Sequence, residues 1–88
     1  MTHRLDIDFA RAEGAVLRLI GLVERKGFEV CAIDMAETGE GPARLSLSVN
    51  ARDSGRRIEV LSRHVEKVYG VTAVHRHEIH SPYLEAAS

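Results

Sequence analysis

The stretch of sequence that decides the fold is residues 14–30, GAVLRLIGLVERKGFEV. Its apolar residues recur at the three- and four-residue intervals of one helix face: Val16, Leu19, Ile20 and Val23. Gly27 follows the charged end of this run, and glycine readily takes the positive φ at which helices commonly end. The stretch therefore predicts a helix that stops near Gly27 and leads directly into another element.

The segments on either side of this helix are predicted to be strands. Apolar and polar residues alternate through residues 5–9, the pattern of a half-buried strand. Residues 28–35, FEVCAIDM, form an apolar run typical of a second strand. The composition of residues 38–42, TGEGP, then predicts the turn of a hairpin.

The second half of the chain repeats this plan. Residues 45–49 alternate again, and residues 71–79 form the last predicted strand. A helix between them is predicted by apolar residues at helical spacing: Ile58, Leu61, Val65 and Val68. Asp53 or Ser54 is its expected N-cap. The order βαββαβ predicts an α+β, ferredoxin-like sandwich, in which an antiparallel four-stranded sheet carries two helices on one face.

The first helix and its flanks carry four short motifs: Gly14-Ala15-Val16, Arg18, Ile20-Gly21-Leu22 and Gly27-Phe28. Together they resemble the ACT domain of the small regulatory subunits of acetolactate synthase, also called acetohydroxyacid synthase. Residues 27–36, GFEVCAIDMA, are similar above all to the short, single-domain small subunit of the valine-insensitive isozyme. The resemblance extends over residues 5–77, nearly the whole chain.

The resemblance implies one ACT domain over residues 1–80, and the lack of pattern in residues 81–88 predicts a flexible tail. It implies a non-catalytic, cytoplasmic homodimer that binds and activates the large subunit of acetolactate synthase. That large subunit holds thiamine diphosphate, magnesium and flavin, and it condenses pyruvate with pyruvate or 2-oxobutyrate in branched-chain amino acid biosynthesis. The small subunit would carry no cofactor, no metal and no catalytic residue of its own.

In ACT domains an amino acid effector binds at the turn between the first strand and the first helix, against the second strand of a partner. The resemblance places a possible effector site here at Arg11, Gly14, Ala15, Val16, Glu29 and Val30. Gly14 would let a ligand approach the backbone, and the N–H groups that follow it suit a carboxylate. The expected dimer interface is the second strand, with Phe28, Val30 and Ala32. A tight turn that binds nothing is the alternative interpretation.

Two positions depart from the valine-responsive pattern, which has Asn where Arg11 and Glu29 stand. An Asn amide both donates and accepts hydrogen bonds, whereas Arg only donates and ionised Glu only accepts. Arg11 and Glu29 could instead pair with each other across a dimer interface. The sequence therefore predicts a degenerate effector site.

Composition excludes several classes of function. Twelve Lys and Arg residues and thirteen Asp and Glu residues give a formal net charge of −1, which offers no electrostatic footprint for nucleic acid. No apolar run approaches the roughly 20 residues of a membrane span, and the polar N-terminus is unlike a signal peptide. Cys31, the one cysteine, fits a reducing cytoplasm and is expected in the core as a small apolar residue.

Other polar residues could carry chemistry. His75, His77 and His80 are of a type that binds zinc, but their spacing crosses the predicted end of a strand, so polar residues on a sheet face are the favoured interpretation. Asp6 and Asp8 are expected on the sheet face opposite the core, where they would be solvated or interfacial rather than an acid–base pair.

Other functions on the same fold are weighed against the regulatory subunit. A stand-alone ACT homodimer that senses an amino acid and regulates another protein stays open. An acylphosphatase-type enzyme could use Arg11 and Asn50, but the Gly-rich phosphate loop is missing. An RNA-binding sheet needs aromatic residues on its central strands, where only Phe9 is found. A metallochaperone needs a pair of cysteines.

Overall fold

The computed structural model describes residues 2–36 and 41–79. The elements follow in the order β1 (Thr2–Phe9), α1 (Ala15–Arg25), β2 (Phe28–Ala36), β3 (Ala43–Ala51), α2 (Ile58–Glu66) and β4 (Val71–Ile79). The predicted βαββαβ order is confirmed. Most of the predicted hairpin turn, along with His80 and the tail at residues 81–88, lies outside the described residues.

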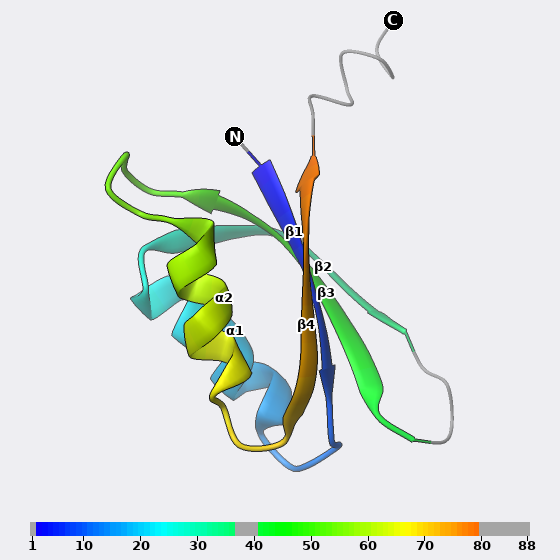
Figure 1. The fold of residues 1–88 in the computed structure, drawn as a ribbon. Coiled ribbons are helices and arrows are strands. Elements are labelled where there is room, and N and C mark those ends of the chain that lie inside the picture. Colours follow the sequence, from blue (N-terminus) through cyan, green and yellow to red (C-terminus); the bar gives the residue numbers. More distant parts are fainter. Residues whose placement is uncertain (1, 37–40, 80–88) are drawn as a thin grey trace, which may run out of the picture.

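The four strands form one antiparallel sheet in the order β2-β3-β1-β4. Both helices cover the same face of this sheet and run in opposite directions, so that the start of α1 lies at the same end of the molecule as the end of α2 (Figure 1). Strands β1 and β3 are central, and β2 is an edge strand, as predicted.

The core lies between the sheet and the helices. One face of β1 and β3 contributes seven buried apolar side chains: Leu5, Ile7, Phe9, Ala43, Leu45, Leu47 and Val49. The helices contribute Leu19 and Val23 from α1 and Leu61 and Val65 from α2. The apolar stripes predicted from helical spacing are thus confirmed, with the remaining members of each stripe packed at the margin of the core.

Helix α2 begins later than the sequence suggested, because its N-cap is Arg57 rather than Asp53 or Ser54. The Asp53 carboxylate instead accepts a hydrogen bond from the N–H of Gly55, at 2.9 Å, and pairs with Arg56 at 3.4 Å. Asp side chains close local turns of this kind as readily as they cap helices. Asp53 therefore shapes the turn before the helix.

Cys31 is exposed, so the expectation of a core cysteine was wrong. The register between β2 and β3 shifts between Val30 and Ala32, which makes Cys31 the extra residue of a β-bulge. Its Sγ accepts a hydrogen bond from Nδ2 of Asn50 at 3.2 Å. Residues 30–33, VCAI, are apolar without alternation that would reveal a bulge, so this exposure could not be predicted from the sequence.

Candidate effector site

The turn between β1 and α1, residues 10–14, is fixed at both ends by backbone hydrogen bonds. The N–H of Ala10 donates to the carbonyl of Gly70 at 2.8 Å, which ties the turn to the connection between α2 and β4. The N–H of Ala15 donates to the carbonyl of Ala12 at 3.1 Å. Gly14, the N-cap of α1, has a φ of 80°, a conformation that glycine takes without strain. Gly14 therefore opens the helix, as predicted.

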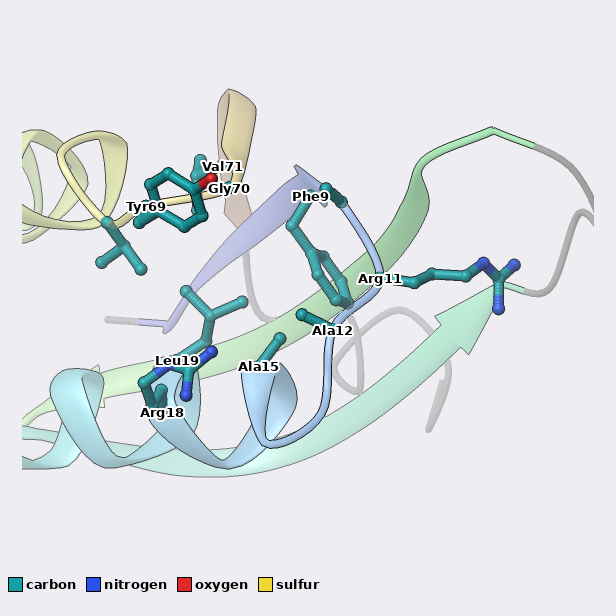
Figure 2. A pocket seen from close by; sticks show the side chains of 11 residues that line it. Phe9, Arg11, Ala12, Ala15, Arg18, Leu19, Tyr69, Gly70 and Val71 are labelled. Carbon is teal, nitrogen blue, oxygen red and sulfur yellow. The ribbon is translucent and has the colours of Figure 1, made fainter.

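A cavity of about 230 Å³ adjoins this turn on the side of α2, and we call it the turn pocket (Figure 2). Its walls are mainly apolar and come from the turn, from α1 and from residues 68–71: Phe9, Ala12, Ala15, Leu19, Val68 and Val71. Arg18 and Tyr69 add polar groups, and no carboxylate is among the described residues that line it. The turn pocket is thus an apolar cavity formed within one chain.

The Arg18 side chain folds back over the start of its own helix. Its Nη1 atom lies 3.4 Å from the point where a Cβ on Gly14 would stand. Arg18 has no ion pair or hydrogen bond through its side chain within residues 2–36 and 41–79. The first turn of α1 contains no acidic residue, so this guanidinium adds to the positive end of the helix dipole.

A second, more open hollow lies on the other side of the turn, towards β2, and we call it the edge groove. It is lined by Phe9, Arg11, Ala12, Glu13, Val16 and Met35. In Figure 2 the Arg11 side chain extends away from Ala15 and Leu19 of the turn pocket, towards the end of β2. Arg11 therefore belongs to the edge groove more than to the turn pocket.

The predicted effector residues fall into two groups. Four of them gather at the turn: Arg11, Gly14, Ala15 and Val16. Glu29 and Val30 lie at the opposite end of the sheet, because Glu29 is in register with Asn50, and Asn50 with Thr2 at the start of β1. Within one chain, Arg11 and Glu29 are thus separated by the length of β1. Their pairing between two chains stays a prediction.

The edge of the sheet at β2 differs in detail from the expected interface. The Phe28 side chain is only 2% exposed and belongs to the core, so it can offer an edge partner nothing but its backbone. Large apolar side chains are exposed elsewhere: Ile33 at 55% and Met35 at 37% on β2, and Leu17 at 77% on α1. Ile33 and Met35 are in register with core residues of β3. This register depends on strand pairing, so the sequence analysis did not single out these two side chains.

The sheet face opposite the helices carries a network of charges around β1. Oδ1 of Asp6 accepts a hydrogen bond from Ser46 Oγ at 2.7 Å, while Oδ2 lies 3.1 Å from Nε2 of His77. Nε of Arg4 lies 3.2 Å from the same carboxylate. Asp6 lies on the sheet face opposite the core, as expected, but it is buried rather than solvated or interfacial, and these partners explain how its charge is accommodated.

Asp8 continues the network one step along β1. It receives two hydrogen bonds from Arg44, at 2.7 and 3.0 Å, and His75 lies 3.9 Å away. His75 and His77 therefore share a strand face, as predicted, but each faces a carboxylate. Within the described residues no group of three or more His, Cys, Asp or Glu side chains could hold a metal ion.

These contacts shift the pKa of both carboxyl groups. Burial raises the pKa of Asp6, but the hydrogen bond from Ser46 and the charges of Arg4 and His77 together outweigh it and leave the pKa lowered. The hydrogen bond from Arg44 lowers the pKa of Asp8, against a smaller opposing effect of burial. Both groups therefore favour the ionised form in the folded state.

Comparison with known proteins identifies the family. Residues 11–74 match the model of the ACT domain, so the chain belongs to the ACT domain family. Comparison with curated proteins finds no significant match. In the part of the chain that the structure describes, no helix is long and apolar enough to cross a membrane.

Solved structures share the fold at low sequence identity. The ACT domain from GTP pyrophosphokinase of Chlorobium tepidum is 17% identical with a TM-score of 0.70, over 86% of this chain and 96% of that one. The regulatory subunit of aspartate kinase from Thermus thermophilus is 13% identical with a TM-score of 0.57, over 84% of this chain and 50% of that one. Formyltetrahydrofolate deformylase from Burkholderia mallei is 15% identical with a TM-score of 0.66, over 89% of this chain and 28% of that one.

Two of these relatives are larger chains of which the present chain spans half or less. None of the three is an acetolactate synthase subunit. The family match establishes an ACT domain, and these structures share its ferredoxin-like fold.

The charge network on the open sheet face generates a prediction about pH. A carboxyl group with a lowered native pKa stabilises the fold above its unfolded pKa, and this stabilisation is lost as pH falls through the native value. The free energy of unfolding should therefore decline as the pH drops below about 4, and Asp6→Asn should reduce this decline. Chemical denaturation at pH 7 and pH 3 measures the difference.

Asp34→Asn is the matched control, because Asp34 is an exposed carboxylate of β2 with no ion pair among the described residues. It should leave the pH dependence of stability unchanged. An equal effect of the two substitutions would show that the Asp6 network contributes nothing specific.

Proposed function

We propose that this chain is a regulatory subunit of acetolactate synthase, which binds the thiamine-diphosphate-dependent large subunit and raises its activity in branched-chain amino acid biosynthesis. The single observation that carries this proposal is the set of subfamily motifs in α1 and β2. The structure gives these motifs defined positions: Gly14 begins α1 beside the turn, and Gly27 and Phe28 end α1 and begin the edge strand. The motifs thus lie at the two elements through which an ACT domain would meet a ligand and a partner.

A homodimer formed by the β2 edges fits this proposal. The outer side of β2 is unpaired in the sheet, and β2 itself carries two exposed apolar side chains, Ile33 and Met35. An antiparallel pairing of two β2 strands centred on Ala32 would place the partner's Glu29 opposite Met35. That residue would then face the edge groove, which holds Arg11. The predicted effector residues would be reunited between two chains.

The proposed subunit carries no chemistry of its own. The residues for an acylphosphatase-type reaction are not brought together, because Asn50 is in register with the start of β1 whereas Arg11 follows its end. The turn pocket offers neither a carboxylate nor a histidine among the described residues that line it, and so no acid–base pair. Catalysis would reside in the large subunit.

The chain alone should show no acetolactate synthase activity, and its addition to the cognate large subunit should raise turnover several-fold. The steady-state rate of acetolactate formation at increasing ratios of the two chains measures this. The Chlorobium ACT domain, which shares the fold at 17% identity, is the control and should not activate. A large subunit that is unaffected by a stoichiometric amount of the chain would favour the second candidate, a stand-alone ACT homodimer that regulates another protein.

The chain should sediment as a dimer at micromolar concentration. Ile33→Asp should dissociate it, because this substitution places a charge on the apolar margin of the β2 edge. Val60→Asp, at an exposed apolar position of α2, is the matched control and should remain dimeric. A monomeric wild-type chain, or a dimer that only Val60→Asp disrupts, would contradict pairing through β2.

Valine should bind more weakly than about 1 mM, or roughly −4 kcal/mol, because Arg11 and Glu29 replace two amides that both donate and accept. The double substitution Arg11→Asn with Glu29→Asn should increase the affinity, as measured by calorimetry. Replacing Glu24 and Arg52, an exposed pair 4.0 Å apart and away from the turn, with Asn should have no such effect. Tight binding of valine by the wild-type chain would show that the site is intact.

A further inference from the structure

We propose that the turn pocket binds a small organic monocarboxylate that has an apolar body and no ammonium group, with Arg18 holding the carboxylate. The inference rests on the proposed regulatory function only insofar as a ligand beside the β1–α1 turn would act as its effector. The site differs from the effector site between two chains, because every residue of the pocket belongs to one chain.

The charge of the pocket selects an anion. Arg11 and Arg18 are the charged side chains among its described lining residues, and Arg11 extends towards the edge groove (Figure 2). Arg18 has no partner for its guanidinium among the described residues, and its Nη1 lies near Gly14 at the start of α1. A guanidinium in this position can donate two parallel hydrogen bonds to one carboxylate. A bound carboxylate would also offset the positive charge that Arg18 adds to this end of the helix.

The walls of the pocket select the body of the ligand. Phe9 and Leu19, which are 2% and 1% exposed, form part of the cavity, and valine and alanine side chains form most of the rest. The volume of about 230 Å³ is below the roughly 300–1,000 Å³ of sites for drug-sized ligands. A short, branched aliphatic chain matches both the size and the apolar character of these walls.

The same lining disfavours an amino acid. Three carbonyls beside the pocket already accept backbone hydrogen bonds: Ala12 from Ala15, Val68 from Val71, and Gly70 from Ala10. No carboxylate among the described lining residues would balance an ammonium group. A cation moved from water into such a site is destabilised unless it finds a counter-charge. A carboxylic acid should therefore bind better than the amino acid with the same carbon skeleton.

Calorimetry on the isolated chain tests this with two probes that differ only in the ammonium group, 4-methylpentanoate and leucine. We expect saturable binding of 4-methylpentanoate and at least about tenfold weaker binding of leucine. Chemical-shift changes in the backbone amides of Ala15 and Gly70, without changes at Gly27, would locate the ligand in the turn pocket. Leucine binding as tightly as the acid, or no saturable binding of the acid up to about 10 mM, would overturn the proposal.

Arg18→Gln tests the role of the guanidinium, with Arg25→Gln as a matched control. Arg25 lies on the same helix, and its Nη1 is 3.4 Å from the Cβ position of Gly21, just as Arg18 lies over Gly14. Arg18→Gln should weaken binding of 4-methylpentanoate at least tenfold, and Arg25→Gln should leave it unchanged. Equal affinities of the two variants would overturn the assignment of Arg18.

Ala12→Leu provides a second test, since it fills the cavity without removing a charge. This substitution should also weaken binding of the acid. Unchanged affinity would place the ligand elsewhere.

These measurements use the chain alone, whereas activation of the large subunit can be measured without any added ligand. A failure of this inference and a failure of the proposed function are therefore distinguishable.

Discussion

The central position of β1 is the constraint on which the rest of the structure depends. This strand pairs with β3 on one side and β4 on the other, so the side chains on each of its two faces must fit against side chains from both neighbouring strands. Leu5, Ile7 and Phe9 meet the helices, while Asp6 and Asp8 meet polar side chains from the flanking strands. A shift of β1 by one residue would bury the carboxylates in the core and expose the apolar side chains, so its register is strongly determined.

The end of β1 also determines where two hollows of the molecule lie. The chain leaves the sheet after Phe9 and is at once tied to the α2–β4 connection by the hydrogen bond from Ala10 to Gly70. This link holds the turn between α1 and the end of α2, and it creates a hollow on each side. The turn pocket is closed by elements of the same chain, whereas the edge groove opens towards β2. Two neighbouring hollows of different polarity therefore share one short segment of backbone.

Much of this architecture could be predicted from the sequence because the information is local. Helical spacing defined the buried faces of α1 and α2, and alternation defined those of β1 and β3. Long-range features could not be predicted. Asp6 is buried because Ser46 and His77, forty and seventy-one residues away, bring partners to it. Asp53 was the expected cap of α2, yet its competing bond to Gly55 is invisible in a composition pattern.

The candidate site shows the same division. Gly14 and its turn were predicted, since glycine readily takes the positive φ that a tight turn between a strand and a helix requires. The turn pocket was not, because its far wall comes from residues 68–71, which no spacing connects to the turn. Arg11 and Glu29 were assigned to one site by resemblance. The strand register places them at opposite ends of the sheet, so one chain alone cannot bring them together.

The bulge at Cys31 makes the edge strand of the sheet irregular. A regular edge strand offers a uniform row of backbone donors and acceptors that any extended polypeptide can extend. The extra residue breaks that row near the middle of β2, so a foreign strand can match one half of it but not both. Because bulges interrupt the regular row of an edge strand, this edge is a poorer template for open-ended strand addition than a regular strand would be.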